Sequence, residues 1–155
     1  AGKKITLKYE PAPQYGTGGH DVILNGIKAS DSRYSDSEWL GFLNSDFEGT
    51  IDLITADYID NVKMRFYNYN RDGIFSPSEI EIYGSKDNSE FRLIGGMRLA
   101  NLADSNILDA NIRIFDQKRF RYLKILVKKS SYAAEYQKNQ TEKYNWLFVD
   151  EIVIE

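Results

Sequence analysis

The chain has 155 residues, 42% of them hydrophobic and 14% aromatic, and this length suits a single domain with one core. Its formal net charge of −3 argues against nucleic acid or an anionic membrane as the main partner, because both favour proteins with a strong basic excess. The absence of cysteine excludes disulfides and thiolate metal sites, and the sequence has no run of about 20 apolar residues that would span a membrane.

Short segments in which apolar and polar residues alternate dominate the chain and predict β-strands with one buried face. The first places Ile5, Leu7 and Tyr9 on one side, with threonine and lysine between them. In chain order, the predicted strands lie at residues 5–9, 50–53, 62–67, 79–83, 91–94, 112–115, 123–128 and 148–154. Eight short strands separated by turn signals are typical of an all-β sandwich or jelly roll.

Two connections carry signals of their own. Asp87 and Asn88 lie between strand-forming segments and tolerate left-handed backbone, so they predict a hairpin over residues 85–91. Residues 131–143 have no sustained apolar stripe, which predicts a polar loop with one helical turn at most.

The residues available for catalysis are few. The single histidine, His20, follows a glycine-rich run, but no Lys-Ser/Thr pair or helix pattern follows it as a phosphate-binding loop requires. The simpler interpretation is that His20 is a solvated loop residue without a function, and the alternative is that it contacts a ligand. Residue types leave a two-carboxylate glycosidase site open, yet the acidic residues are scattered and favour a solvated surface. A binding function therefore fits the sequence better than turnover.

The most informative stretch is residues 24–53, with Leu-Asn-Gly at 24–26, Trp-Leu-Gly-Phe at 39–42 and Ile-Asp-Leu at 51–53. Two later blocks are Ile-Phe-Ser-Pro-Ser-Glu-Ile-Glu-Ile at 74–82 and Trp-Leu-Phe-Val-Asp-Glu-Ile at 146–152. Together these blocks resemble the discoidin or F5/8 type C family, specifically the type called carbohydrate-binding module family 32, found at the C-terminus of bacterial chitobiase-like β-hexosaminidases. The resemblance implies an eight-stranded antiparallel jelly-roll β-sandwich, the galactose-binding-domain-like fold.

The resemblance also implies a structural calcium ion under the sugar-binding loops. Calcium takes about six to eight oxygen ligands, which suits a loop rich in Asp, Ser and carbonyl groups beside a C-terminal Glu. The expected ligands are Leu24, Asn25, Ser30, Asp31, Asp36 and Glu151. Asn25 stands where the family often has Asp, so the alternative at this position is an Asn-Gly turn without a metal.

Sugar recognition in such a module would combine an aromatic ring under a pyranose with charged or amide groups on its hydroxyls. By resemblance, the expected ligand contacts are Arg33, Tyr34, Trp39, Tyr67, Tyr69, Asn70, Arg71, Phe75 and Tyr144. Either tryptophan, Trp39 or Trp146, could instead plug the core, and for Trp146 the core is favoured. Residues 68–73 are expected to form an exposed tip.

The resulting hypothesis is a non-catalytic module, residues 1–155, taken from the C-terminus of a larger bacterial glycosidase. Its expected partners are a glycan of galactose or N-acetylhexosamine type and the parent catalytic domain. It is expected to be monomeric and extracytoplasmic, whether periplasmic, on the outer surface or secreted. The alternative is a structural or protein-docking domain of the same fold that has lost sugar binding, as Gly73 and the polar 130–145 loop depart from the family pattern. A domain with enzyme activity of its own is the third hypothesis.

Overall fold

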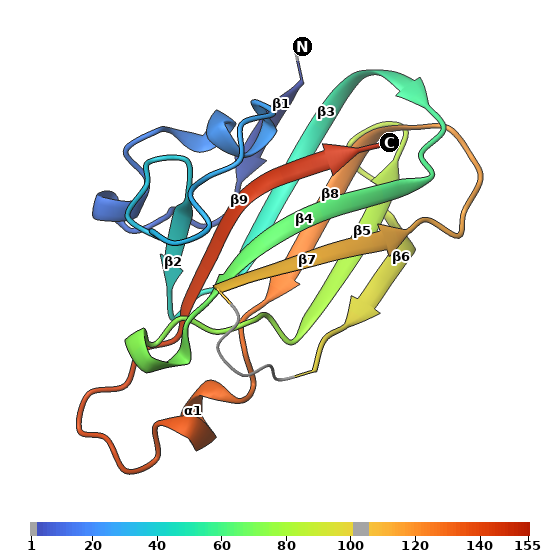
Figure 1. Cartoon of the computed structure of the whole chain (residues 1–155). Coiled ribbons are helices and arrows are strands. Elements are labelled where there is room, and N and C mark those ends of the chain that lie inside the picture. Colours follow the sequence, from blue (N-terminus) through green and yellow to red (C-terminus); the bar gives the residue numbers. More distant parts are fainter. Residues whose placement is uncertain (1–2, 101–105) are drawn as a thin grey trace.

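Nine β-strands form two sheets in the computed structural model, which describes residues 3–100 and 106–155 (Figure 1). The strands are β1 (Lys4–Leu7), β2 (Leu40–Leu43), β3 (Phe47–Asp57), β4 (Asn61–Asn68), β5 (Glu79–Ser85), β6 (Arg92–Arg98), β7 (Asn106–Arg113), β8 (Phe120–Lys128) and β9 (Trp146–Ile154). Short helices occupy the connections: the 3-10 helices η1 (Pro13–Tyr15), η2 (His20–Leu24) and η3 (Asn70–Asp72), and the single α-helical turn α1 (Ala133–Tyr136). No helix among the described residues is long and apolar enough to cross a membrane.

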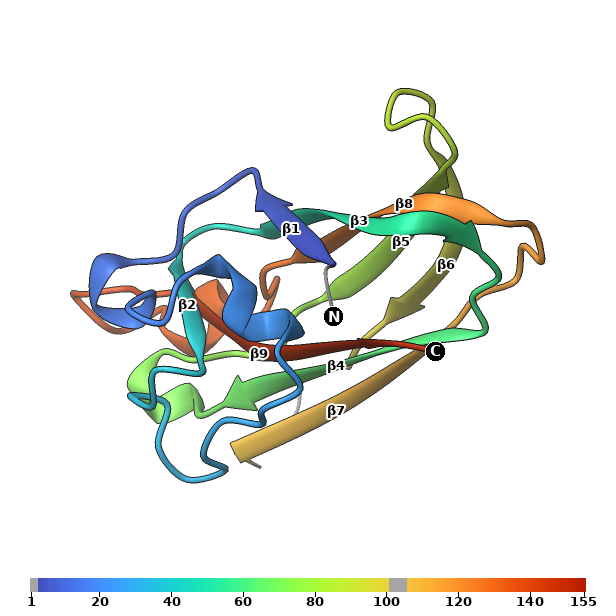
Figure 2. The same cartoon turned by 90° about the horizontal axis from the view of Figure 1, so that it is seen from above.

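The two sheets pack face to face as the layers of a sandwich, which Figure 2 shows from the side. One sheet has the strand order β1-β3-β8-β5-β6 and the other β2-β9-β4-β7, and every pairing of neighbouring strands is antiparallel. Because strands that follow each other along the chain often lie in opposite sheets, connections cross between the layers at both ends. This is the all-β antiparallel sandwich that the strand pattern predicts.

The alternation in the sequence corresponds to the inner and outer faces of the sheets. In β8, Leu123, Ile125 and Val127 are fully buried, while the residues between them are partly exposed. Full burial of one such side chain contributes about 1.5–3 kcal/mol, so the interior between the sheets is the main source of stability.

Each of the eight predicted strands overlaps an observed strand, but the one predicted at 112–115 meets β7 only at its last two residues, since β7 begins at Asn106. The ninth, β2, was not among them because its four residues, Leu-Gly-Phe-Leu, show no alternation: the first three are all buried. Pairing with β9 forms this strand, in the register Leu40 to Val149.

Both predicted connections are confirmed. The β5–β6 hairpin turns at Asn88, whose φ is 62°, and the Ser85 hydroxyl accepts the backbone N–H groups of Asp87 and Asn88. The polar loop between β8 and β9 contains one helical turn, α1.

The sandwich has two ends with different loops (Figure 1). One end gathers η3, the loop before β2 and the long loop that contains α1. The opposite end carries the β5–β6 hairpin, the β7–β8 connection and the β3–β4 turn. The first is called the η3 end below, and the second the hairpin end.

Candidate functional site

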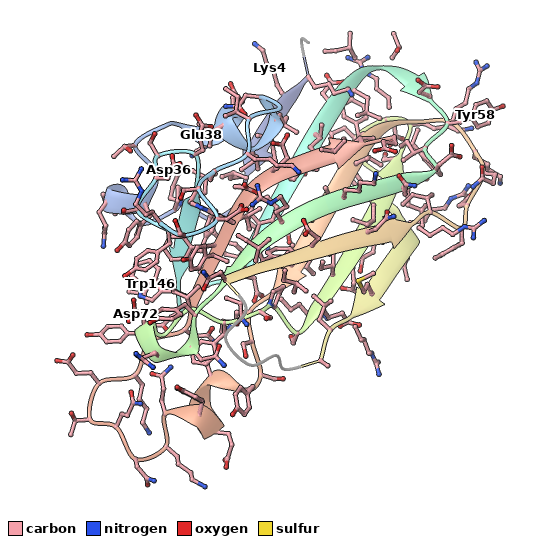
Figure 3. All side chains as sticks on the ribbon, viewed as in Figure 1. Lys4, Asp36, Glu38, Tyr58, Asp72 and Trp146 are labelled. Carbon is pink, nitrogen blue, oxygen red and sulfur yellow. The ribbon has the colours of Figure 1, made fainter. Side chains whose placement is uncertain are left out.

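The η3 end brings together partly exposed aromatic rings and charged groups from three separate loops. The Tyr34 hydroxyl donates a hydrogen bond of 3.0 Å to Oδ2 of Asp72, which joins the loop before β2 to η3. The Arg71 guanidinium lies 5.9 Å from the centre of the Tyr69 ring. Figure 3 shows Asp72 and Trp146 near each other at this end of the molecule. We define the site cluster as Tyr34, Tyr69, Arg71, Asp72, Tyr144 and Trp146.

A backbone device holds the η3 tip in place. Gly73 ends η3 in the left-handed region, at φ 75°, and its N–H bonds to the Asn70 carbonyl. A Cβ at this position would lie 3.1 Å from Cβ of Tyr144, and the Trp146 N–H donates to the Gly73 carbonyl at 2.8 Å. A glycine here therefore lets η3 rest directly on the last loop while Arg71 and Asp72 stay exposed.

Below the site cluster lies a floor of aromatic rings packed edge to face. The Tyr34 ring centre is 5.6 Å from that of Tyr67 and 5.4 Å from that of Phe148. Tyr15 lies 5.1 Å from Trp146 and 4.9 Å from Phe148, so it closes the same group from the other side. Each such pair contributes about 0.5–1.5 kcal/mol beyond burial, and together they make a stiff platform.

The electrostatics of the site keep Tyr34 a hydrogen-bond donor. Burial and the hydrogen bond to Asp72 raise the pKa of Tyr34 to about 12, so its hydroxyl stays protonated at neutral pH. Because that hydroxyl donates to Oδ2, the other Asp72 oxygen and the remaining lone pairs can accept from a ligand.

The predicted ligand contacts separate into accessible and buried residues. Tyr34 and Tyr69 are half-buried, Arg33 and Arg71 are exposed, and Tyr144 is 41% exposed. Residues 68–73 form an exposed tip only at Arg71 and Asp72, since Asn68 and Asn70 are buried. A surface binding site built on this end therefore uses a subset of the residues predicted from the sequence.

Three predicted ligand contacts are wrong as direct contacts because their rings are buried. Trp39 is 0%, Tyr67 3% and Phe75 2% exposed. The Trp39 ring packs on Tyr67 at 5.5 Å and its indole N–H donates to the Ser30 carbonyl, while Phe75 lies under Tyr136 at 5.6 Å. An open end of a sandwich must be filled by large side chains, and these rings fill it.

Asn70, at 7% exposed, is also too buried to be a surface contact through its side chain. Trp146 is more exposed than predicted: the sequence favoured a place in the core, and the residue is half-buried. Its indole lies against Tyr15 and Phe148, and the remainder reaches the surface beside Asp72 (Figure 3).

The predicted calcium ligands fall into two groups. Leu24 and Glu151 line one pocket of about 250 Å³, together with Gly26. Glu151 is 4% exposed, its Oε2 has no hydrogen-bond partner, and burial raises its pKa. Asn25 lies between Leu24 and Gly26 in the chain. Its side-chain amide donates a hydrogen bond to Glu38 and accepts one from the N–H of Ile27.

The remaining three predicted ligands have other partners. Asp36 accepts the N–H groups of Ser30 at 2.9 Å and Glu38 at 3.1 Å, and Asp31 pairs with Arg65. Across residues 3–100 and 106–155, no three Asp, Glu, His or Cys side chains cluster as a metal site. A cation at Glu151 would therefore draw most of its ligands from backbone carbonyls.

Two functional elements are missing from the sequence-based site. Asp72 follows Arg71, a predicted ligand contact. The only feature of the sequence that could have pointed to Asp72 was an acidic residue in a turn. Arg65 is a charged residue inside an apolar-patterned strand: it donates to Oδ2 of buried Asp150 at 2.8 Å. The same oxygen accepts the N–H of Ala29 at 2.8 Å, so this pair fastens the loop before β2 onto the sheet.

Comparison with known proteins shows what fold this is. No family model matches the sequence. No curated protein matches it either. Among solved structures, a family 32 carbohydrate-binding module from a family 31 glycoside hydrolase of Clostridium perfringens superposes with a TM-score of 0.60 at 18% identity, covering 99% of this chain and 93% of that one.

Two further solved structures extend the likeness. The C-terminal domain of a chitobiase from Bacteroides fragilis has a TM-score of 0.60 at 14% identity, with 99% of this chain and 92% of that one covered. A family 32 module of a Clostridium perfringens family 89 enzyme, solved in complex with GalNAc-β-1,3-galactose, has a TM-score of 0.59 at 14% identity, covering 98% and 94%. The chain has the fold of these modules over almost its whole length.

Proposed function

We propose that the chain is a non-catalytic carbohydrate-binding module that holds a parent glycoside hydrolase near its glycan. The observation that carries the proposal is the site cluster: aromatic rings, a carboxylate and a guanidinium exposed side by side on a stiff aromatic floor. The fold shared with modules of glycoside hydrolases supports it.

Each group of the cluster has a role that fits a pyranose. A half-exposed ring such as Trp146 or Tyr69 offers a flat apolar face to the C–H face of the sugar. Asp72 can accept from two neighbouring hydroxyls, and the Arg71 guanidinium can donate to a vicinal pair as a fork. The Tyr34–Asp72 hydrogen bond holds the carboxylate in place before the ligand arrives, which limits the entropy lost on binding.

The proposed ligand is a glycan ending in galactose or an N-acetylhexosamine. One of the similar modules was solved with a disaccharide of this type, which supports the choice. The proposed module acts as a monomer outside the cytoplasm of a bacterium, covalently joined to its catalytic domain. A calcium ion next to Glu151 belongs to the same proposal; the orphaned, buried Oε2 fits a cation, and the ion would brace the turn at residues 24–26.

Nuclear magnetic resonance titration of the labelled chain with galactose, N-acetylglucosamine and N-acetyllactosamine tests the proposal. We expect shifts at residues 33–34, 69–73 and 144–146, with a Kd around the millimolar range, or about −4 kcal/mol. Asp72→Ala should weaken binding about tenfold, whereas Lys143→Gln, on the neighbouring loop, should not. No shift in these segments with any glycan would favour a structural or docking domain instead. Release of dye from chromogenic hexosaminides would contradict the non-catalytic assignment.

A further inference from the structure

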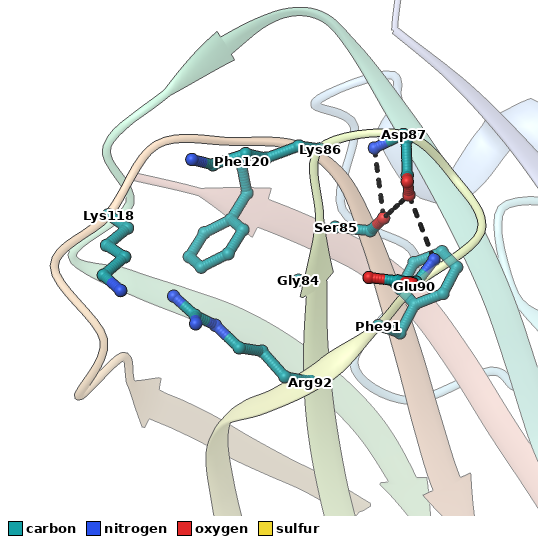
Figure 4. Close-up of a pocket in the computed structure, with 9 residues that line it drawn as sticks. All are labelled: Gly84, Ser85, Lys86, Asp87, Glu90, Phe91, Arg92, Lys118 and Phe120. Carbon is teal, nitrogen blue, oxygen red and sulfur yellow. Dashed lines mark hydrogen bonds between the residues drawn. The ribbon is translucent and has the colours of Figure 1, made fainter.

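The hairpin end contains a pocket of about 400 Å³ that is separate from the site cluster (Figure 4). It is lined by Gly84, Ser85, Lys86, Asp87, Glu90, Phe91, Arg92, Lys118 and Phe120, which come from the β5–β6 hairpin, the β7–β8 connection and the start of β8. This volume lies within the range of roughly 300–1,000 Å³ that is usual for small-molecule sites. The pocket is therefore large enough for a sugar residue.

The pocket has an apolar floor. Phe120 is 2% exposed, and a Cβ on Gly84 would lie 2.8 Å from its ring, so the ring rests directly on the backbone of β5. Phe91 is half-buried at the side, with the Lys124 ammonium 4.2 Å from its ring centre. Phe120 is as buried as Phe75, so it shapes the bottom of the pocket, and Phe91 is the ring here that the C–H face of a pyranose could contact.

Cationic groups surround this floor. Figure 4 shows Arg92 and Lys118 reaching into one space beside Phe120. Asp116 pairs with Nη2 of Arg92 at 2.8 Å and the guanidinium lies 5.5 Å from the Phe120 ring centre, so Arg92 is held in place with donors to spare. Neither Lys86 nor Lys118 forms an ion pair with a carboxylate of the described residues.

The pocket lining contains two carboxylates, Asp87 and Glu90, against the three cations Lys86, Arg92 and Lys118. Oδ1 of Asp87 accepts hydrogen bonds from Ser85, Ser89 and Glu90, so it is occupied within the hairpin turn. Residues 84–92 and 113–124 together contain seven Lys and Arg against three Asp and Glu, a net +4 on a chain of net −3. These two segments are thus a basic part of an acidic protein, and the β3–β4 turn at the same end adds the acidic residues Asp57 and Asp60.

We propose that this pocket is a second saccharide site, selective for a sugar residue that carries an anionic group, a carboxylate or a sulfate. The half-buried Phe91 would contact the sugar ring, and Arg92, Lys118 and Lys86 would bind the anion. The inference depends on the proposed function only in taking the ligand to be a saccharide. Two sites at opposite ends would let one module contact two points of an acidic glycan.

The test titrates the labelled chain with methyl β-D-glucuronide and, as the neutral match, methyl β-D-glucoside at equal ionic strength. We expect saturating shifts at residues 85–92 and 116–120 with the glucuronide, at least tenfold weaker binding of the glucoside, and no coincident shift at residues 69–73. Lys118→Gln and Lys86→Gln should each weaken glucuronide binding about five- to tenfold, because each removes one charge-assisted contact. Lys143→Gln, which removes one charge at the η3 end, is the control and should leave the affinity unchanged.

Three results would overturn the inference. Equal binding of glucoside and glucuronide would show that the pocket does not select for the anionic group. An equal loss of affinity in Lys143→Gln would show that only the net charge of the chain matters, and not the position of Lys86 and Lys118. If inorganic sulfate shifts the same amides as strongly as glucose 6-sulfate, the pocket is a general anion site with no role for the sugar ring. Because the readout is resolved by residue, failure here and failure at the site cluster are distinguished in one spectrum.

Discussion

The two ends of the sandwich hold their loops in place in different ways, although both use aromatic and charged side chains. At the η3 end, rings fill the opening between the sheets and a buried ion pair fastens a long loop, so the exposed groups sit on a rigid base. At the hairpin end, a short turn bonded through Asp87 needs no such anchor, and its cations surround a hollow. Loop length explains the contrast: a long loop must be fastened by tertiary contacts, whereas a tight hairpin carries its own hydrogen bonds.

The largest difference between the two ends is expected when Asp150 is removed, because its carboxylate fastens the loop before β2 to the sheet. Asp150→Ala should destabilise the chain by about 3–5 kcal/mol, because it leaves the buried Arg65 guanidinium without its buried partner, with the exposed Asp31 carboxylate remaining, and the Ala29 N–H without its acceptor. Asp87→Ala, at the other end, should cost clearly less, since the turn is exposed. Urea unfolding of both variants measures the difference, and similar losses would show that the ends are not held differently.

Calcium should act on the turn at residues 24–26 and the adjoining part of β9, and leave the hairpin end unaffected. If an ion binds beside Glu151, saturation at about 100 times its Kd would stabilise the native state by about 2.7 kcal/mol, and a chelator would reverse the rise in melting temperature. Glu151→Gln should abolish the response, whereas Asp36→Asn should keep it, because Asp36 is engaged with backbone N–H groups elsewhere. A response that is unchanged in Glu151→Gln would exclude this site.

The aromatic floor and the charged tip should have separable effects on glycan binding. Trp146→Ala should weaken binding about tenfold or more by removing the stacking face. Arg71→Gln should weaken it about three- to tenfold, with the melting temperature unchanged because the side chain is exposed. Isothermal titration calorimetry with the best-bound glycan compares the two. Equal affinity of both variants and the wild type would place the ligand elsewhere.

Stability should also depend on pH through Asp150, the buried carboxylate that holds the loop before β2. Burial raises the pKa of Asp150 to about 6, against its ordinary value of 3.8, so the folded chain holds a proton that the unfolded chain releases. Stability from this group is therefore greatest below pH 4 and falls as the pH rises to 6. Relative to Asp150→Asn, the wild type should lose up to about 3 kcal/mol across that window, because a tenfold difference in proton affinity corresponds to about 1.4 kcal/mol. A flat difference would mean that Asp150 is charged throughout.

The strand segments were predictable because alternation is a local property of each strand. A residue on β8 faces the core or the solvent according to its parity, and Leu123, Ile125 and Val127 obey this rule. The hairpin at Asn88 was predictable for the same reason, since the left-handed preference belongs to the residue itself. β2 was not, because only its partner β9 defines it.

The candidate site could be predicted only in outline. The chemical types that reach the surface at the η3 end, tyrosine, arginine and tryptophan, were found from the sequence, but their exposure was not. Trp39 and Trp146 have the same chemistry, and the first is buried while the second is half-buried. Asp72 was missed because its partner, Tyr34, lies 38 residues away.

The sequence by itself determined the all-β class, the positions of eight strands and the surplus of aromatic and sugar-compatible side chains. Periodicity, turn residues and composition are local, and each can be read without knowing what lies across the fold. Only the tertiary structure decided which rings plug the end of the sandwich, which carboxylate meets which tyrosine, and that the cations of the hairpin end surround one hollow. Those outcomes depend on contacts between residues far apart in the chain, and local preference does not encode such contacts.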